Sequence, residues 1–135
     1  MDYDADGDLD VLSGSYTGEI YLFERGETGE YLTGRYLMNA EGTPLETGTS
    51  VTPEAIDMDA DGDLDLVMAS STGISLWINQ EKWTFTERTS GSLLKGSETV
   101  KPVSLAAVDW DRNVLVDILV GHDQAPLARL ENIRH

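Results

Sequence analysis

Three copies of a ten-residue acidic segment occur in the chain, and this internal repeat constrains the fold more than any other feature. The first copy covers residues 2–11 (DYDADGDLDV), the second residues 57–66 (DMDADGDLDL) and the third residues 109–118 (DWDRNVLVDI). The copies begin 55 and 52 residues apart. A repeat of this period is typical of architectures that stack copies of one supersecondary unit.

Short apolar runs surround each acidic segment in the same order. They are bounded by Gly, Ser, Thr, Asn and Asp, and they are rich in β-branched and aromatic residues. This composition predicts strands, and no window shows a sustained helical apolar period. The predicted strands cover residues 11–12, 20–23 and 31–37, then 52–56, 66–68, 74–78 and 83–89, and finally 103–108, 118–120 and 127–133.

Four short antiparallel strands in about 53 residues match one blade of a β-propeller, so the sequence predicts an all-β chain. We expect one repeat domain over residues 1–135, with blades at 1–50, 51–100 and 101–135. The first blade lacks its first strand and the last lacks its fourth, which leaves about two and a half blades. A propeller closes with typically 4–8 blades. The chain is therefore expected to be a partial propeller, or one closed by oligomerisation; an open stack of blades is the alternative.

Five carboxylates crowd into nine residues in loop one (residues 2–10) and again in loop two (residues 57–65). Such carboxylates repel one another unless a cation lies among them, and six to eight oxygen ligands suit Ca²⁺. Glycine at position 6 allows the sharp turn. The predicted ligands are the side chains of positions 1, 3, 5 and 9 and the carbonyl oxygen of position 7. In loop one these residues are Asp2, Asp4, Asp6, Asp10 and Asp8, and in loop two they are Asp57, Asp59, Asp61, Asp65 and Asp63.

Other metal sites fit these loops less well. An EF-hand begins with the same D-x-D-x-D-G, but it needs Glu at position 12, where this chain has Ser13 and Met68. Mg²⁺ is a weaker alternative because it prefers strict octahedral geometry with retained waters. Zinc and iron favour His or Cys, whereas the chain has no cysteine and only His122 and His135.

Loop three (residues 109–117) keeps part of the pattern. Its oxygen-bearing residues are Asp109, Asp111, Asn113 and Asp117, with the carbonyl oxygen of Leu115 at position 7. Val114 replaces the glycine, and a β-branched residue disfavours positive φ. Arg112 is expected to compete with a cation for the carboxylates. The sequence therefore predicts two Ca²⁺ sites and a weakened third, with a vestigial turn held by Asp–Arg pairing as the alternative for loop three.

The motif D-x-D-x-D-G-D-x-D-[LV], followed by an apolar strand, a Gly turn and an aromatic-apolar strand, resembles the FG-GAP/VCBS-type repeat. That repeat is found in the integrin α-chain propeller and in many bacterial secreted propellers. The resemblance implies Ca²⁺ between the first and second strands of each blade, with ligands at positions 1, 3, 5, 7 and 9. It also implies an extracellular, periplasmic or cell-surface location.

The net charge of −16 argues against nucleic acid as a partner, because phosphates would be repelled. No apolar run approaches the roughly 20 residues of a membrane span. We expect no enzymatic activity: His122, Asp123 and Ser104 lack a G-x-S-x-G framework, and 13 of the 25 acidic residues lie in the three loops. A part of a polysaccharide-acting enzyme is the alternative.

The preferred function is a module for protein or glycan binding and adhesion, with self-association or packing on neighbouring blades as a further expectation. Tyr16, Trp77, Trp83 and Trp110 are candidates for stacking on sugars, although Trp77 is expected to pack between blades. The Gly/Thr/Pro-rich segment 38–50 is either a recognition loop or an inter-blade connection.

Overall fold

The secondary structure is entirely β in the computed structural model, which describes residues 1–88, 94–95 and 102–134. Within those residues no helix is long and apolar enough to cross a membrane. The strands are β1 (Val11–Gly14), β2 (Ile20–Phe23), β3 (Arg35–Tyr36), β4 (Thr52–Ile56), β5 (Asp65–Ser70), β6 (Gly73–Asn79), β7 (Phe85–Arg88), β8 (Leu94–Lys95), β9 (Pro102–Val108), β10 (Asp117–His122) and β11 (Ala128–Asn132).

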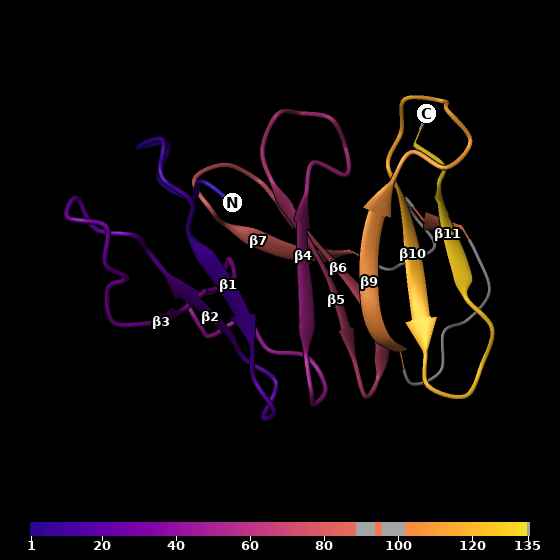
Figure 1. Cartoon of the computed structure of the whole chain (residues 1–135), viewed down its shortest axis with the longest axis horizontal. Helices are drawn as coiled ribbons and strands as arrows, with labels where there is room; N and C mark the ends of the chain where they lie inside the picture. The colour runs from indigo at the N-terminus through magenta and orange to yellow at the C-terminus, as the bar shows by residue number, and fades with distance from the viewer. Residues whose placement is uncertain (89–93, 96–101, 135) are drawn as a thin grey trace.

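These strands form three antiparallel sheets that stand side by side in an open row (Figure 1). The first sheet has the order β1-β2-β3, the second β4-β5-β6-β7 and the third β8-β11-β10-β9. Strand β4 contacts both β1 and β9, so the three sheets adjoin along one edge. The first sheet has no counterpart of β4, as predicted. The all-β prediction of four-stranded antiparallel units, with an incomplete first copy, is confirmed.

The fourth strand of the third sheet was not predicted. We expected only three strands there, but β8 pairs with β11, with Lys95 opposite Glu131 and Leu94 opposite Asn132. This strand precedes β9 in the chain and yet lies at the far edge of the sheet. Two residues show no recognisable alternation, and a pairing across more than thirty residues leaves no local signal.

The apolar core lies between the sheets in two clusters. One cluster joins the first and second sheets through residues such as Leu22, Leu66 and Trp77. The other joins the second and third sheets through residues such as Val67 and Ile118. Successive side chains of a strand point to opposite faces, so β5 supplies both clusters and is buried along its whole length.

The segment of residues 38–50 connects the first sheet to the second. Its Leu45 is buried in the core between these sheets, and the Leu45 N–H donates to the Leu37 carbonyl. The Ala40 N–H donates to the carbonyl of Phe85 in β7. These contacts agree with the interpretation of this segment as an inter-blade connection.

Candidate metal centre

All three acidic loops lie at the same end of the sheets (Figure 1). Each loop leads directly into the strand that is the second of four in the repeat, namely β1, β5 or β10. The backbone of each loop has positive φ at positions 4 and 6. The values are 60°, 54° and 61° at Ala5, Ala60 and Arg112, and 94°, 99° and 74° at Gly7, Gly62 and Val114. The loops therefore share one backbone shape, and Val114 adopts the left-handed conformation that its branched side chain disfavours.

Hydrogen bonds from the backbone turn the side chains of positions 1 and 5 into each loop. The N–H of position 6 donates to the carboxylate of position 1, at 3.1 Å for Gly7 to Asp2 and 3.2 Å for Gly62 to Asp57. The N–H of position 7 donates to position 5, at 2.9 Å for Asp63 to Asp61. Each bond leaves the second oxygen of the carboxylate available to another partner.

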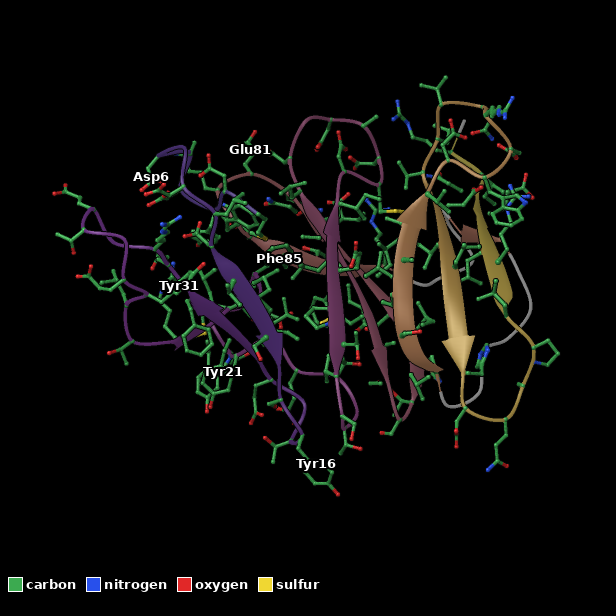
Figure 2. The ribbon with its side chains drawn as sticks, viewed as in Figure 1. Asp6, Tyr16, Tyr21, Tyr31, Glu81 and Phe85 are labelled. Carbon is green, nitrogen blue, oxygen red and sulfur yellow. The ribbon has the colours of Figure 1, made fainter. Side chains whose placement is uncertain are left out.

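In loops one and two, carboxylates from several positions converge. Oxygens of Asp2, Asp4 and Asp10 lie within 4.8 Å of one another, and so do oxygens of Asp57, Asp59 and Asp61. Figure 2 shows the side chains of loop one gathered beside Asp6, which is not one of the converging three. The sequence predicted all six of these residues as ligands. The roles predicted for Asp6 and for the carbonyl oxygens of positions 7 remain predictions.

The converging groups include three buried carboxylate oxygens without a hydrogen-bond partner: Oδ1 of Asp2, of Asp57 and of Asp59. Buried polar atoms are nearly always paired, and a buried carboxylate oxygen that has no donor is costly. Burial raises the pKa of Asp59, and the neighbouring charge of Asp61 raises it further. The side chain of Asp4 is exposed, and its pKa is raised by partial desolvation and by the neighbouring charges of Asp6, Asp10 and Asp2. A cation among these oxygens would satisfy them and reverse these shifts, so the donor set fits a hard divalent ion.

The aspartates at position 9 have a second role that the sequence analysis missed. Asp10, Asp65 and Asp117 are buried, and each accepts a backbone N–H at both carboxylate oxygens. The donors to Asp65 are Met58 at position 2 and Asn79 at the end of β6, both at 2.8 Å. Each position-9 carboxylate therefore clamps its loop to the end of the next strand of its sheet or, in loop one, to Arg25 just beyond that end. Burial raises the pKa of Asp65 to about 6, against the opposing effect of these two hydrogen bonds.

The same clamp is present at the other two loops. Asp10 accepts from the N–H groups of Tyr3 at 2.6 Å and Arg25 at 2.8 Å. Asp117 accepts from Trp110 at 3.3 Å and Asn132 at 2.9 Å. The donors recur at position 2 and fifteen or fourteen residues after position 9. They are backbone N–H groups of different residue types, so the three sequence copies alone do not reveal them.

Loop three differs in its side chains. Nη2 of Arg129, from β11, lies 2.6 Å from Oδ2 of Asp111 and 2.8 Å from Oδ2 of Asp117. The hydrogen bond to Asp111 is the first cause of a raised pKa at Arg129. We expected Arg112 to compete for these carboxylates, but the arginine that contacts them is Arg129. Among the described residues, the converging carboxylates occur in loops one and two.

Comparison with known families agrees with this arrangement. The sequence model of the FG-GAP-like repeat matches residues 2–67 and 57–120. Each match runs from one acidic loop into the strand that follows the next loop, and together they cover most of the chain. This chain belongs to the FG-GAP-like repeat family. The resemblance stated from the sequence is confirmed, and the three sheets are propeller blades of this repeat. No curated protein and no solved structure matched the chain.

The remaining candidate residues of this FG-GAP-like protein are dispersed. Trp77 is 8% exposed and belongs to the core between the first two blades, as expected. Trp83 stacks on Tyr3 of loop one at 4.2 Å between ring centroids. Trp110 and Tyr16 are 58% and 80% exposed, and Tyr16 lies at the end of the molecule opposite the acidic loops (Figure 2).

The residues considered for a nucleophilic triad show another arrangement. Nδ1 of His122 lies 3.1 Å from the carbonyl oxygen of Pro126, within the turn between β10 and β11. Ser104 lies in β9 opposite Gly121. His122 is therefore engaged by its own hairpin.

Proposed function

We propose that this FG-GAP-like protein is a calcium-binding propeller-repeat module in which loops one and two each hold a structural Ca²⁺. The observation that carries the proposal is the set of buried, unpartnered oxygens on Asp2, Asp57 and Asp59, at the centres of two loops of the same shape. Asp4, Asp10 and Asp61 complete the converging groups. The carbonyl oxygens of Asp8 and Asp63 and the side chains of Asp6 and Asp65 are the further ligands that the repeat pattern predicts.

The ion would supply positive charge to carboxylates that the fold gathers and partly buries. The chain prepares each loop for this: the N–H of Gly7 or Gly62 orients position 1, and the position-9 clamp fixes the loop to its blade. An ion that binds only the folded loop stabilises the protein by RT ln(1 + [Ca]/Kd), about 2.7 kcal/mol per site at a hundredfold excess. In the second blade calcium thus acts as a structural link between β4 and β5, the strands on either side of loop two, and in the first blade it holds loop one beside β1.

This proposal favours a location outside the cytoplasm. Extracellular calcium modules have dissociation constants on the order of 10⁻⁴–10⁻³ M, which only the calcium concentrations found outside cells would satisfy. We propose a non-catalytic role there, in protein or glycan binding and adhesion. Of the four aromatic residues considered from the sequence, Trp110 and Tyr16 are the exposed ones and could contact such a ligand. A glycan array that gives the same signals for the protein and for its Trp110→Ala and Tyr16→Ala variants would refute the glycan part.

The outer face of the first sheet suggests that a further blade packs on it. The outer face of the first blade carries Tyr21, which packs on Phe23 and Tyr36 and donates a hydrogen bond from its hydroxyl to that of Tyr36 at 3.0 Å. We propose that another blade, of a longer chain or of a second copy, covers this face. Light scattering with Ca²⁺ tests the second-copy form, which a monomeric mass of 14.8 kDa would exclude.

Calcium titration by calorimetry tests the metal sites directly. We expect two sites in the metal-free protein, one site in Asp59→Asn, and two in the control Asp123→Asn, which removes the same charge from an exposed position outside the loops. Melting temperature should rise with Ca²⁺ and fall again with chelator. A melting temperature that does not respond to Ca²⁺ would overturn the proposal, and an equal response to Mg²⁺ would overturn the choice of metal.

A further inference from the structure

Arg129 occupies a position that is apolar in the other two blades. The register places Leu22 opposite Leu12, Leu76 opposite Val67 and Arg129 opposite Leu119. Leu12, Val67 and Leu119 each lie two residues after the position-9 aspartate of their loop, so the three pairs are equivalent. Leu22 and Leu76 are fully buried in the cores between blades. The third blade therefore has the cationic side chain of Arg129 at the position where the other two blades have a buried leucine.

The guanidinium of Arg129 bridges two positions of loop three. Its Nη2 contacts Asp111 at position 3 and Asp117 at position 9, and its Nε donates to the same oxygen of Asp117 at 3.0 Å. Asp117 is fully buried, so this pair is shielded from solvent on one side. Removing the cation from a buried ion pair strongly destabilises a protein, because the carboxylate is left buried and uncompensated. Arg129 is therefore a structural part of loop three.

The backbone of loop three keeps the form of the other loops. Val114 has a φ of 74°, and its N–H donates to Asp109 at 3.1 Å, as Gly62 does to Asp57. The side chains supply less negative charge: Asn113 and Leu115 stand at positions 5 and 7, where loops one and two have aspartates. Three carboxylates remain instead of five, so a single positive charge offsets a larger share of their repulsion.

We propose that the Arg129 guanidinium is the resident cation of loop three and excludes calcium from it. The loop keeps the shape of a metal site but is closed by a covalently attached charge. A guanidinium also matches carboxylates through directed N–H donors, which a spherical ion lacks. The contrast with loops one and two rests on their proposed calcium binding, whereas the contacts of Arg129 do not depend on it.

Calcium stoichiometry tests the exclusion. The protein should bind two ions by calorimetry and by native mass spectrometry, and the double variant Asp4→Asn/Asp59→Asn, which weakens loops one and two, should bind none. Arg129→Met should gain a third site, whereas Arg112→Met, with the same charge change in the same loop, should stay at two. Three ions in the unaltered protein, one in the double variant, or two in folded Arg129→Met would each overturn the proposal.

A measurement without calcium separates this proposal from the proposed function and does not require calcium binding. In metal-free buffer, the loss of melting temperature in the double variant Arg129→Met/Asp111→Asn should be smaller than the sum of the losses in the two single variants. The reason is that each single substitution already removes the same Arg129–Asp111 ion pair. Additive losses would overturn the role of Arg129. Where Arg129→Met does not fold, Arg129→Lys replaces it in this cycle, because lysine keeps the charge but loses the second directed contact. If coupling is found and no calcium binds, Arg129 is still the cation of loop three and only the proposed function fails.

Discussion

Replacement of Asp65 by asparagine tests the clamp that ties loop two to β6. Both oxygens of this fully buried carboxylate accept a backbone N–H at 2.8 Å, from Met58 and from Asn79. Asparagine has the same shape but only one acceptor oxygen, so one N–H faces an NH₂ group and loses its partner. A hydrogen bond to a charged group contributes about 1.5–3 kcal/mol, and a buried N–H without a partner costs about 1–3 kcal/mol.

One effect opposes this loss. The raised pKa of Asp65 shows that its ionised form is costly to bury, and the neutral amide removes that cost. We therefore expect a net loss of about 2 kcal/mol at pH 7, toward the lower end of the hydrogen-bond range. For a chain of this length that corresponds to a melting temperature lower by roughly 6–10 °C.

The assay is thermal and urea unfolding in metal-free buffer, so that calcium does not contribute. Asp63→Asn is the matched control, because it removes the same charge from an exposed side chain in the same loop. Its effect should stay within about 0.5 kcal/mol, as for other surface substitutions. If Asp65→Asn and Asp63→Asn unfold at the same temperature, the clamp does not stabilise the blade and the reasoning is wrong.

Two further predictions concern the same loops. The pKa of Asp65 is raised from 3.8 to about 6 in the folded protein, so the stabilisation that comes from its protonation is full below pH 3.8 and is lost as the pH rises through 6. In metal-free buffer the urea midpoint should therefore fall across this window, and saturating Ca²⁺ should remove the fall; a midpoint that rises instead would contradict the shift. Val114→Gly should stabilise the protein by about 0.5–1 kcal/mol, since Val114 is 87% exposed with a φ of 74° and glycine relieves that strain. Urea unfolding beside Val103→Gly, an exposed strand position where glycine should destabilise, checks this; equal effects of the two substitutions would refute it.

The sequence was sufficient where the signal is local. Alternating apolar runs predicted the strands of the second sheet to within a few residues, and the spacing of Asp57, Asp59 and Asp61 predicted three side chains that do converge. What it missed depends on residues far apart in the chain. Arg129 reaches Asp111 only because the register of β10 and β11 brings it across the sheet. The prediction that Arg112, which follows Asp111 in the sequence, would contact these carboxylates was wrong.

The position-9 clamp was missed for a related reason. The spacing predicts that aspartate at this position is a ligand, because it completes the coordination pattern. Its hydrogen-bond donors are backbone N–H groups, which every residue except proline carries and which therefore leave no mark in the composition. Only the folded loop shows that Asp65 and Asp117 act within the protein as well as toward an ion.

The burial of β5 on both faces makes the second blade the cooperative centre of this chain. Leu66 belongs to the core shared with the first blade and Val67 to the core shared with the third, so neither core survives if β5 leaves its sheet. Unfolding of the second blade should therefore carry both neighbours with it in a single transition. An ion in loop two, which is anchored to β5 through Asp65, would act on the stability of the whole chain, whereas an ion in loop one would act mainly on the first blade.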